Sequence, residues 1–195
     1  MAMEYIVKQL VDKMERNHLI MPDQIDRYIY VLQLKIESTV SALCLLILSY
    51  LFHVVMPTVF FLIAVSALKK RCGGIHADTF AQCLGSTVII YIFFVKCIFP
   101  VMLENMRITF IIFLTAFMIV ECIGAFNHPN MNWNREEYRK SKKLSRMMAF
   151  IEFFVTLMML ALKADLTIII FFMFAMMLSA FLLILAKIFG NEVRL

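Results

Sequence analysis

The chain has 195 residues, of which 63% are hydrophobic and 17% are charged, and its mean hydropathy is +0.85. Soluble domains carry about 25% charged residues, so this composition excludes an ordinary soluble globular protein. The charges are clustered, and the apolar stretches between them are long enough to cross a bilayer. We therefore expect an all-α, polytopic integral membrane protein that forms a single membrane domain over residues 1–195.

Residues 1–37 are expected to form a cytoplasmic-surface region. Apolar residues from Met3 to Met14 recur with the i, i+3, i+4, i+7 spacing of an amphipathic helix, which could lie on the membrane or on a partner protein. Pro22 and Asp23 fit the start of a second helix, because proline is favoured there and an acid interacts well with the helix dipole. The region is charged and has no signal-peptide pattern, so no cleavable leader is predicted.

Six apolar blocks follow and predict about six transmembrane helices within residues 38–186, with residues 187–195 as a cytoplasmic tail. The blocks cover residues 39–53, 56–68, 79–95, 107–126, 147–162 and 166–186. The first two are short for a helix that needs about 20 residues to cross the hydrocarbon, and a single kinked element is conceivable. Pro57 fits the start of a new helix, so a hairpin of two helices is the better interpretation.

The distribution of cations supports an even number of spans. With both ends of the chain in the cytoplasm, 16 of the 19 Lys and Arg residues fall in cytoplasmic segments, and only Lys96, Arg107 and Lys163 fall outside. The positive-inside rule predicts this asymmetry. The segment between the second and third spans is therefore expected to face the cytoplasm.

That segment contains the sequence KKRCGGIHADTFAQC, residues 69–83, in which a Cys/His pair adjoins a cation cluster. A thiol becomes a good nucleophile where a histidine, a cation or a helix N-terminus favours its thiolate, and all three are available here. His76 and Cys83 are therefore the candidate catalytic residues. Gly73 and Gly74 permit the tight turn needed to leave one helix and begin the next. Cys83 should lie at the edge of the hydrocarbon.

The spacing of this pair sets a geometric condition. Seven residues of α-helix place His76 and Cys83 about 10.5 Å apart along the axis, whereas a hydrogen bond needs about 3 Å. A direct dyad therefore requires the helical path to break at Gly73 and Gly74, with His76 on the loop or first turn. Otherwise the two groups act through water or through motion.

The other polar groups in or near the apolar blocks give weaker signals. The five cysteines, an odd number without a CxxC pair, fit neither a disulfide framework nor a zinc site, so no metal or cofactor is expected. Glu121 and Glu152 lie in apolar blocks, where a protonated or paired structural role is the better interpretation. His128 fits a loop cap, and it is the first alternative base if the dyad fails. No nucleic-acid partner is expected.

The stretch GGIHADTFAQC resembles the signature of the accessory gene regulator B family. These are membrane cysteine endopeptidases that process the precursor of a cyclic quorum-sensing peptide. In that family a Gly-Gly-x-His-Ala motif precedes a cysteine that lies seven positions after the histidine. Gly73, Gly74, His76, Ala77 and Cys83 match this pattern.

The resemblance extends over essentially the whole chain. The later stretch NHPNMNWNREEYRKSKKLSR is similar to the His-Pro-Asn and basic loop of many members, and the length and the apolar blocks fit too. One position departs from the pattern. An arginine is common seven residues before the histidine, whereas this chain has Lys69, with Arg71 two places on. Lysine is a point charge rather than a bidentate fork, so a contact made there by arginine would be rearranged.

The resemblance implies that Cys83, activated by His76, attacks a propeptide at the junction before its acidic C-terminal tail. The tail leaves, and an internal thiol or hydroxyl of the peptide closes a thiolactone or lactone ring on the resulting thioester. It also implies a homodimer in the cell membrane of a Gram-positive bacterium, with the site toward the cytoplasm. The cations that could support this site, or attract the acidic tail from a solvated loop near anionic lipid, are Lys69, Lys70, Arg71, Arg135, Arg139, Lys142 and Lys143.

Two other classes of protein remain open. A small peptide exporter or permease would also have six spans and intramembrane acids, although the two halves lack the matching interrupted helices of inverted-repeat transporters. A non-catalytic membrane scaffold for a sensor partner is the third interpretation. A short precursor-peptide reading frame beside the gene would favour the peptidase.

Overall fold

The structure is a computed structural model that describes residues 2–17, 19–72, 79–129, 131 and 133–190. Over these residues the chain is helical and contains no β-strand, which confirms the all-α prediction. The helices are α1 (Ala2–Arg16), α2 (Ile25–Leu51), α3 (Val55–Cys72), α4 (Phe80–Phe93), α5 (Phe99–Glu104), α6 (Met106–Ile123), α7 (Arg135–Ala161) and α8 (Leu166–Phe189). A short 3₁₀ turn, Pro22–Gln24, precedes α2, and a π-helical segment, Phe94–Ile98, joins α4 to α5.

Five helical stretches in the described part of the chain are long and apolar enough to cross a membrane. They are Ile25–Leu51, Phe80–Glu104, Met106–Ile123, Arg135–Ala161 and Leu166–Phe189. α3 is not among them, and its last turn consists largely of the cations Lys69, Lys70 and Arg71. The prediction of a polytopic membrane protein is therefore confirmed, whereas the exact number of six spans is not.

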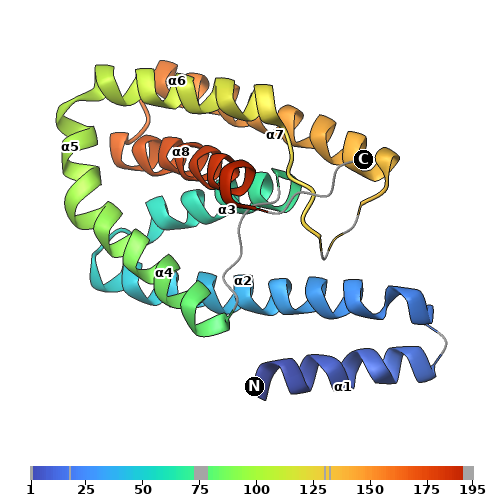
Figure 1. Cartoon of the computed structure of the whole chain (residues 1–195). Coiled ribbons are helices and arrows are strands. Elements are labelled where there is room, and N and C mark those ends of the chain that lie inside the picture. Colours follow the sequence, from blue (N-terminus) through green and yellow to red (C-terminus); the bar gives the residue numbers. More distant parts are fainter. Residues whose placement is uncertain (1, 18, 73–78, 130, 132, 191–195) are drawn as a thin grey trace.

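α3 and α8 lie at the centre of the bundle (Figure 1). α6 and α7 cover one side of this pair, and α2 with α1 lies on the other side. In α8 the eight consecutive residues Ile169–Met176 are all buried. A helix that is apolar on every side is stable only when other helices or lipid surround it, so α8 acts as the core around which the bundle packs.

An aromatic cluster attaches the α4–α5 arm to this core. Phe94 of the π-helical segment stacks on Phe174 of α8 with ring centroids 3.7 Å apart, and it meets Phe171 edge-on at 4.8 Å. Tyr91 of α4 shares a buried hydrogen bond with Thr58 of α3. These contacts fix the C-terminal half of α4, and so they also set the direction in which its N-terminal end points.

The amphipathic N-terminal helix is confirmed as α1, which runs antiparallel to α2 (Figure 1). Its Val7 and Val11 are buried with Ile20 against partly buried apolar residues of α2. α2 then continues without a break from Ile25 into the apolar stretch. The expected boundary between the surface region, which ends at residue 37, and the transmembrane region, which begins at residue 38, therefore falls inside one helix.

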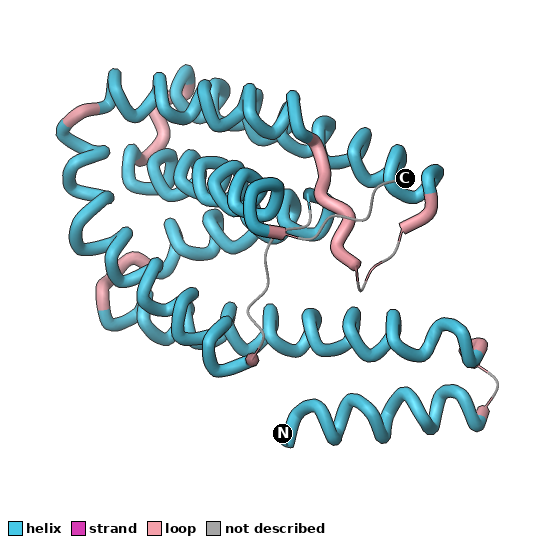
Figure 2. The backbone as a smooth tube through the Cα atoms, in the orientation of Figure 1, coloured by secondary structure: helices cyan, strands magenta, loops and turns pink. Residues whose placement is uncertain are grey.

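Three short connections gather at one end of the bundle, and longer ones lie at the other end (Figure 2). The short ones follow α2, α5 and α7. His53 and Lys163 have φ angles of 57° and 55°, left-handed conformations that reverse the chain within a few residues. α2 ends at Leu51 and α3 begins at Val55, which confirms the predicted hairpin before Pro57.

The cations divide between these two ends. Lys96, Arg107 and Lys163 belong to elements at the end with the short turns, where Lys96 lies 4.7 Å from the centroid of the Phe52 ring. The cations of residues 69–71 and those at the start of α7 belong to the opposite end. This separation is what the positive-inside rule requires, and we propose that the second end faces the cytoplasm.

Labelling of single cysteines in intact cells tests this orientation. We expect an impermeant maleimide to react with Lys96→Cys and Lys163→Cys, because both positions are exposed and would face outward. Lys143→Cys, at an equally exposed position, should react only after the cells are permeabilised. Strong labelling at position 143 in intact cells would invert the topology.

Candidate active site

Cys83 lies near the N-terminus of α4, four residues after the helix cap. The Thr79 hydroxyl accepts a hydrogen bond from the Gln82 N–H at 3.3 Å, and the Cys83 N–H donates to the Thr79 carbonyl at 3.0 Å. The positive end of the helix dipole therefore lies next to the thiol, where it favours a thiolate. The Cys83 side chain is half-buried, so a substrate at this end of the bundle can reach it.

Two charged groups from other helices meet this thiol. The Glu37 carboxyl group of α2 lies near the Cys83 thiol. The Lys69 ammonium, from the last turn of α3, lies within electrostatic range of both groups. The structure thus brings the predicted residues Lys69 and Cys83 together and adds Glu37. The signal for Glu37 in the sequence is a lone acid at the start of an apolar block, where a charge is costly.

His76, the other residue of the predicted catalytic pair, lies outside the part of the chain that the structure describes. His76, Gly73 and Gly74 all fall in residues 73–78. The direct His76–Cys83 dyad and the break of the helical path at the two glycines therefore stay predictions.

The end of α3 that carries Lys69 is fastened by contacts with α7 and with the segment after α6. The Ser141 hydroxyl donates to the Arg71 carbonyl at 2.9 Å, and the Phe126 N–H donates to the Cys72 carbonyl at 2.8 Å. The Cys72 thiol is buried and shares a hydrogen bond with the Ser145 hydroxyl at 2.8 Å. Cys72 is therefore a core residue that joins two helices, although it lies closer to His76 in sequence than Cys83 does.

The connection between α6 and α7 has its own internal order. The Trp133 N–H donates to the Asn127 side-chain oxygen at 3.0 Å, and the Asn127 amide donates to the Trp133 carbonyl at 3.3 Å. Gly124 has φ +79°, and the side chain of Lys142 packs directly over it. The Tyr138 hydroxyl donates to the Ala125 carbonyl at 3.3 Å. These contacts hold the connection in a defined conformation, and the connection in turn holds the end of α3.

His128 lies on the same connection and packs against α2. Its ring stacks on Tyr30 with centroids 5.1 Å apart and an angle of 13° between the planes. Burial lowers the pKa of His128. Tyr30 precedes Glu37 by seven residues, about 10.5 Å of helix rise, so this ring contact lies about two turns along α2 from Glu37.

The basic residues after His128 lie on a helix, and the expectation of a solvated loop is wrong. α7 begins at Arg135 behind a capping box, in which the Asn134 side chain accepts from the Glu137 N–H at 2.8 Å and the Glu137 carboxylate accepts from the Asn134 N–H at 3.1 Å. Glu137 also pairs with Arg27 of α2 at 2.9 Å. The many charges in this stretch suggested a loop, and the capping residues Asn134 and Glu137 were therefore not recognised in the sequence.

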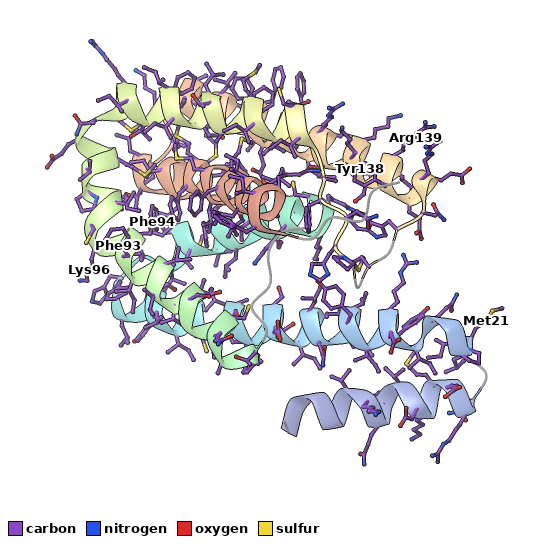
Figure 3. All side chains as sticks on the ribbon, in the orientation of Figure 1. Met21, Phe93, Phe94, Lys96, Tyr138 and Arg139 are labelled. Carbon is purple, nitrogen blue, oxygen red and sulfur yellow. The ribbon has the colours of Figure 1, made fainter. Side chains whose placement is uncertain are left out.

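The cations of α7 still form a surface. Arg135, Arg139 and Lys143 are exposed, whereas Lys142 is half-buried against Gly124. Figure 3 shows Arg139 projecting away from the bundle. Because α7 also holds the end of α3, this basic surface and Lys69 belong to the same end of the molecule.

The other acidic groups of the described residues form no cluster that could hold a metal ion. Within the described ranges, no group of three or more His, Cys, Asp or Glu residues could hold a metal ion. Glu152 is buried in α7, and its two carboxylate oxygens have no hydrogen-bond partner in the described part of the chain. Glu121 lies near Arg146, whose guanidinium donates to the Cys122 carbonyl at 3.2 Å.

Fold and site together define a polytopic helical membrane protein that has a half-buried thiol, near an acid and a lysine, at the polar end of its helices. The family model for accessory gene regulator B matches residues 4–186, nearly the whole chain, and the protein belongs to that family. The resemblance carried by the Gly-Gly-x-His-Ala motif is thereby confirmed. Membership supports a role in the processing or export of an autoinducing peptide in quorum sensing. No curated protein and no solved structure shows a significant match to the chain.

Gly124, which has a positive φ angle in the connection that holds α3, gives a prediction about stability. Gly124→Ala should destabilise the protein by about 1–2 kcal/mol, because a side chain is strained at a positive φ. In addition, its Cβ would lie 2.5 Å from the Lys142 Cγ. Thermal unfolding of the purified protein in detergent measures the effect.

Gly85→Ala is the matched control. Gly85 lies within α4, and a Cβ there meets no atom within 4 Å. Because alanine is a better helix former than glycine, this variant should be neutral or stabilised by up to about 1 kcal/mol. Equal losses of stability in the two variants would contradict the packing described for residues 124–134.

Proposed function

We propose that the protein is a membrane cysteine endopeptidase that removes the C-terminal tail of a quorum-sensing propeptide and promotes its cyclisation. The observation that carries the proposal is the placement of Cys83. Its thiol is half-buried at the N-terminus of α4, and a lysine from α3 lies in electrostatic range. A helix N-terminus and a nearby cation are the settings in which cysteine becomes a nucleophile.

The proposed reaction has two acyl-transfer steps. In the first, the Cys83 sulfur attacks the carbonyl carbon of the scissile amide while His76 takes the thiol proton. The C–N bond then breaks, the proton passes to the leaving amine, and the tail departs from an acyl-enzyme thioester. In the second, a thiol or hydroxyl of the bound peptide attacks the thioester carbonyl, and the Cys83 thiol is regenerated with its proton.

The position of the thiol at the start of a membrane-spanning stretch suits cyclisation. Replacing an amide by a thioester is unfavourable, so loss of the tail has to draw the first step forward. Exchange of one thioester for another is nearly balanced, and water is then the competing nucleophile. Cys83 is the fourth residue of the stretch Phe80–Glu104, so lipid and neighbouring helices can limit access of water to the thioester.

The basic surface of α7 fits a substrate with an acidic tail. Arg135, Arg139 and Lys143 are exposed at the end of the molecule where Lys69 approaches Cys83. Such a surface raises the local concentration of an anionic peptide and also attracts anionic lipid headgroups. In the proposed mechanism these cations guide the tail, and the neighbouring thiol cleaves before it.

Replacement of single cysteines tests the nucleophile. Cys83→Ser should reduce propeptide cleavage by about 100-fold or more, because a hydroxyl is barely ionised and needs much stronger base assistance. Membrane insertion and peptide binding should be unchanged. The measurement is release of the tail from propeptide by the purified variant, followed by mass spectrometry.

Two other cysteines supply the controls. Cys97 is exposed on the π-helical segment, and Cys72 is buried with a hydroxyl partner that serine can keep, so Cys97→Ser and Cys72→Ser should retain most activity. If Cys72→Ser lost as much cleavage as Cys83→Ser, the nucleophile would be misassigned. If Cys83→Ser still released the mature peptide from cells, an exporter without protease activity would be the better account.

A further inference from the structure

The first half of α2 packs on α1 and takes no part in the main cores of the bundle. Val7, Val11 and Ile20 are buried against apolar residues of α1 and of the first half of α2, and they form a cluster of their own. Among the described residues, the two larger cores include no residue of α2 before Leu45. α1 and residues 25–36 of α2 therefore form a unit with its own apolar core, the N-terminal hairpin.

Two side-chain contacts join this hairpin to α7 and to the connection before α7. The Arg27 guanidinium pairs with the Glu137 carboxylate of α7 at 2.9 Å. One turn further along α2, the Tyr30 ring stacks on His128 of the connection, with centroids 5.1 Å apart. Residues three positions apart lie on the same face of a helix, so both contacts are made by one side of α2. The connection also binds the end of α3, so the hairpin is fastened to the segment that holds α3.

The two contacts can open without disturbing the elements that they join. The Arg27 and Glu137 side chains are 42% and 37% exposed, so water can replace the ion pair at little cost. Glu137 uses one carboxylate oxygen for Arg27 and the other for the Asn134 N–H, so the cap of α7 remains when Arg27 leaves. The connection likewise keeps its internal hydrogen bonds when the ring contact is lost.

The other end of α2 provides a pivot for such a movement. The buried residues of α2 are Leu45 and Ser49, and both lie in its last two turns. Residues 25–51 contain neither glycine nor proline, which are common causes of a kink, so α2 can move as a straight rod. Rotation about the buried end therefore moves the hairpin end through the largest distance.

We propose that the N-terminal hairpin is a movable wall of the candidate active site, which closes when Arg27 and Tyr30 bind the start of α7 and the α6–α7 connection. α2 packs against α4, which carries Cys83, and the two helices cross in Figure 1. Opening moves α2 away from the connection and widens the access to Cys83. This inference rests on the proposed function, in which a peptide has to reach that thiol.

The access to Cys83 can be measured without any substrate. The full-length protein keeps Cys83 as its single cysteine, with the other four replaced by serine, and is reconstituted in lipid nanodiscs. Its alkylation rate is measured with N-ethylmaleimide and with a maleimide that carries a long polyethylene glycol chain. Because both reagents attack the same thiolate, the ratio of the two rates does not depend on its ionisation and reports the size of the opening.

Removal of either contact should favour the open state. Arg27→Gln and Tyr30→Leu should each raise the ratio of the large-reagent rate to the small-reagent rate about fivefold, the shift in a two-state population expected from loss of one weak contact. The matched controls Arg27→Lys and Tyr30→Phe keep a cation and a ring, and they should leave the ratio nearly unchanged. The unfolding temperature is measured alongside. A residue that only stabilised the fold would lower this temperature without changing the ratio.

Two results would overturn the proposal. One is an unchanged ratio in Arg27→Gln or in Tyr30→Leu, and the other is a rise in the matched controls as large as that in these variants. Should Tyr30→Leu fail to purify as a folded protein, the comparison of Arg27→Gln with Arg27→Lys decides alone. Equal ratios in those two variants would then reject the movable wall.

The proposed function fails separately. If Cys83→Ser still cleaves propeptide, Cys83 is not the nucleophile, whatever the ratio of alkylation rates shows. If Cys83→Ser is inactive but the hairpin substitutions leave the ratio unchanged, the enzyme assignment survives and the movable wall does not.

Discussion

A lipid bilayer offers polar groups no hydrogen-bond partners, and this constraint decides where the protein can carry out chemistry. Backbone groups satisfy the constraint by forming helices, and reactive side chains satisfy it at helix ends or between helices. Cys83 follows both routes, because it lies near the N-terminus of α4 and this helix packs against α2. Under the proposed function, the position of Cys83 at the start of a membrane-spanning stretch and the reactivity of its thiol have the same physical origin.

The two helix ends that carry Lys69 and Cys83 are fixed by different parts of the bundle. The end of α3 is tied to α7 through Ser141 and Ser145, whereas α4 is held at its far end by the stacking of Phe94 on α8. The site thus depends on contacts that lie well outside the motif. Mutations in α7 or α8 can change the chemistry by moving one end relative to the other.

Local patterns in the sequence predicted much of the fold and proposed Cys83 as the nucleophile. Periodicity gave the amphipathic α1, the proline at position 57 gave the hairpin, and the family motif singled out Cys83. Glu37 was missed because a single acid in an apolar helix does not indicate which thiol it will meet. The start of α7 was mistaken for a loop because its charges outweighed the cap at Asn134. The number of spans stayed open because the last turn of α3 contains three cations.

The central claim is that Cys83 becomes acylated by the propeptide. The most direct test is to mix the purified protein with a quorum-sensing propeptide, to quench in acid, and to measure the intact mass. The account predicts an adduct equal to the propeptide without its tail, located on Cys83, released by hydroxylamine and missing in Cys83→Ser. Tail release without any such adduct, or the same adduct in Cys83→Ser, would contradict it.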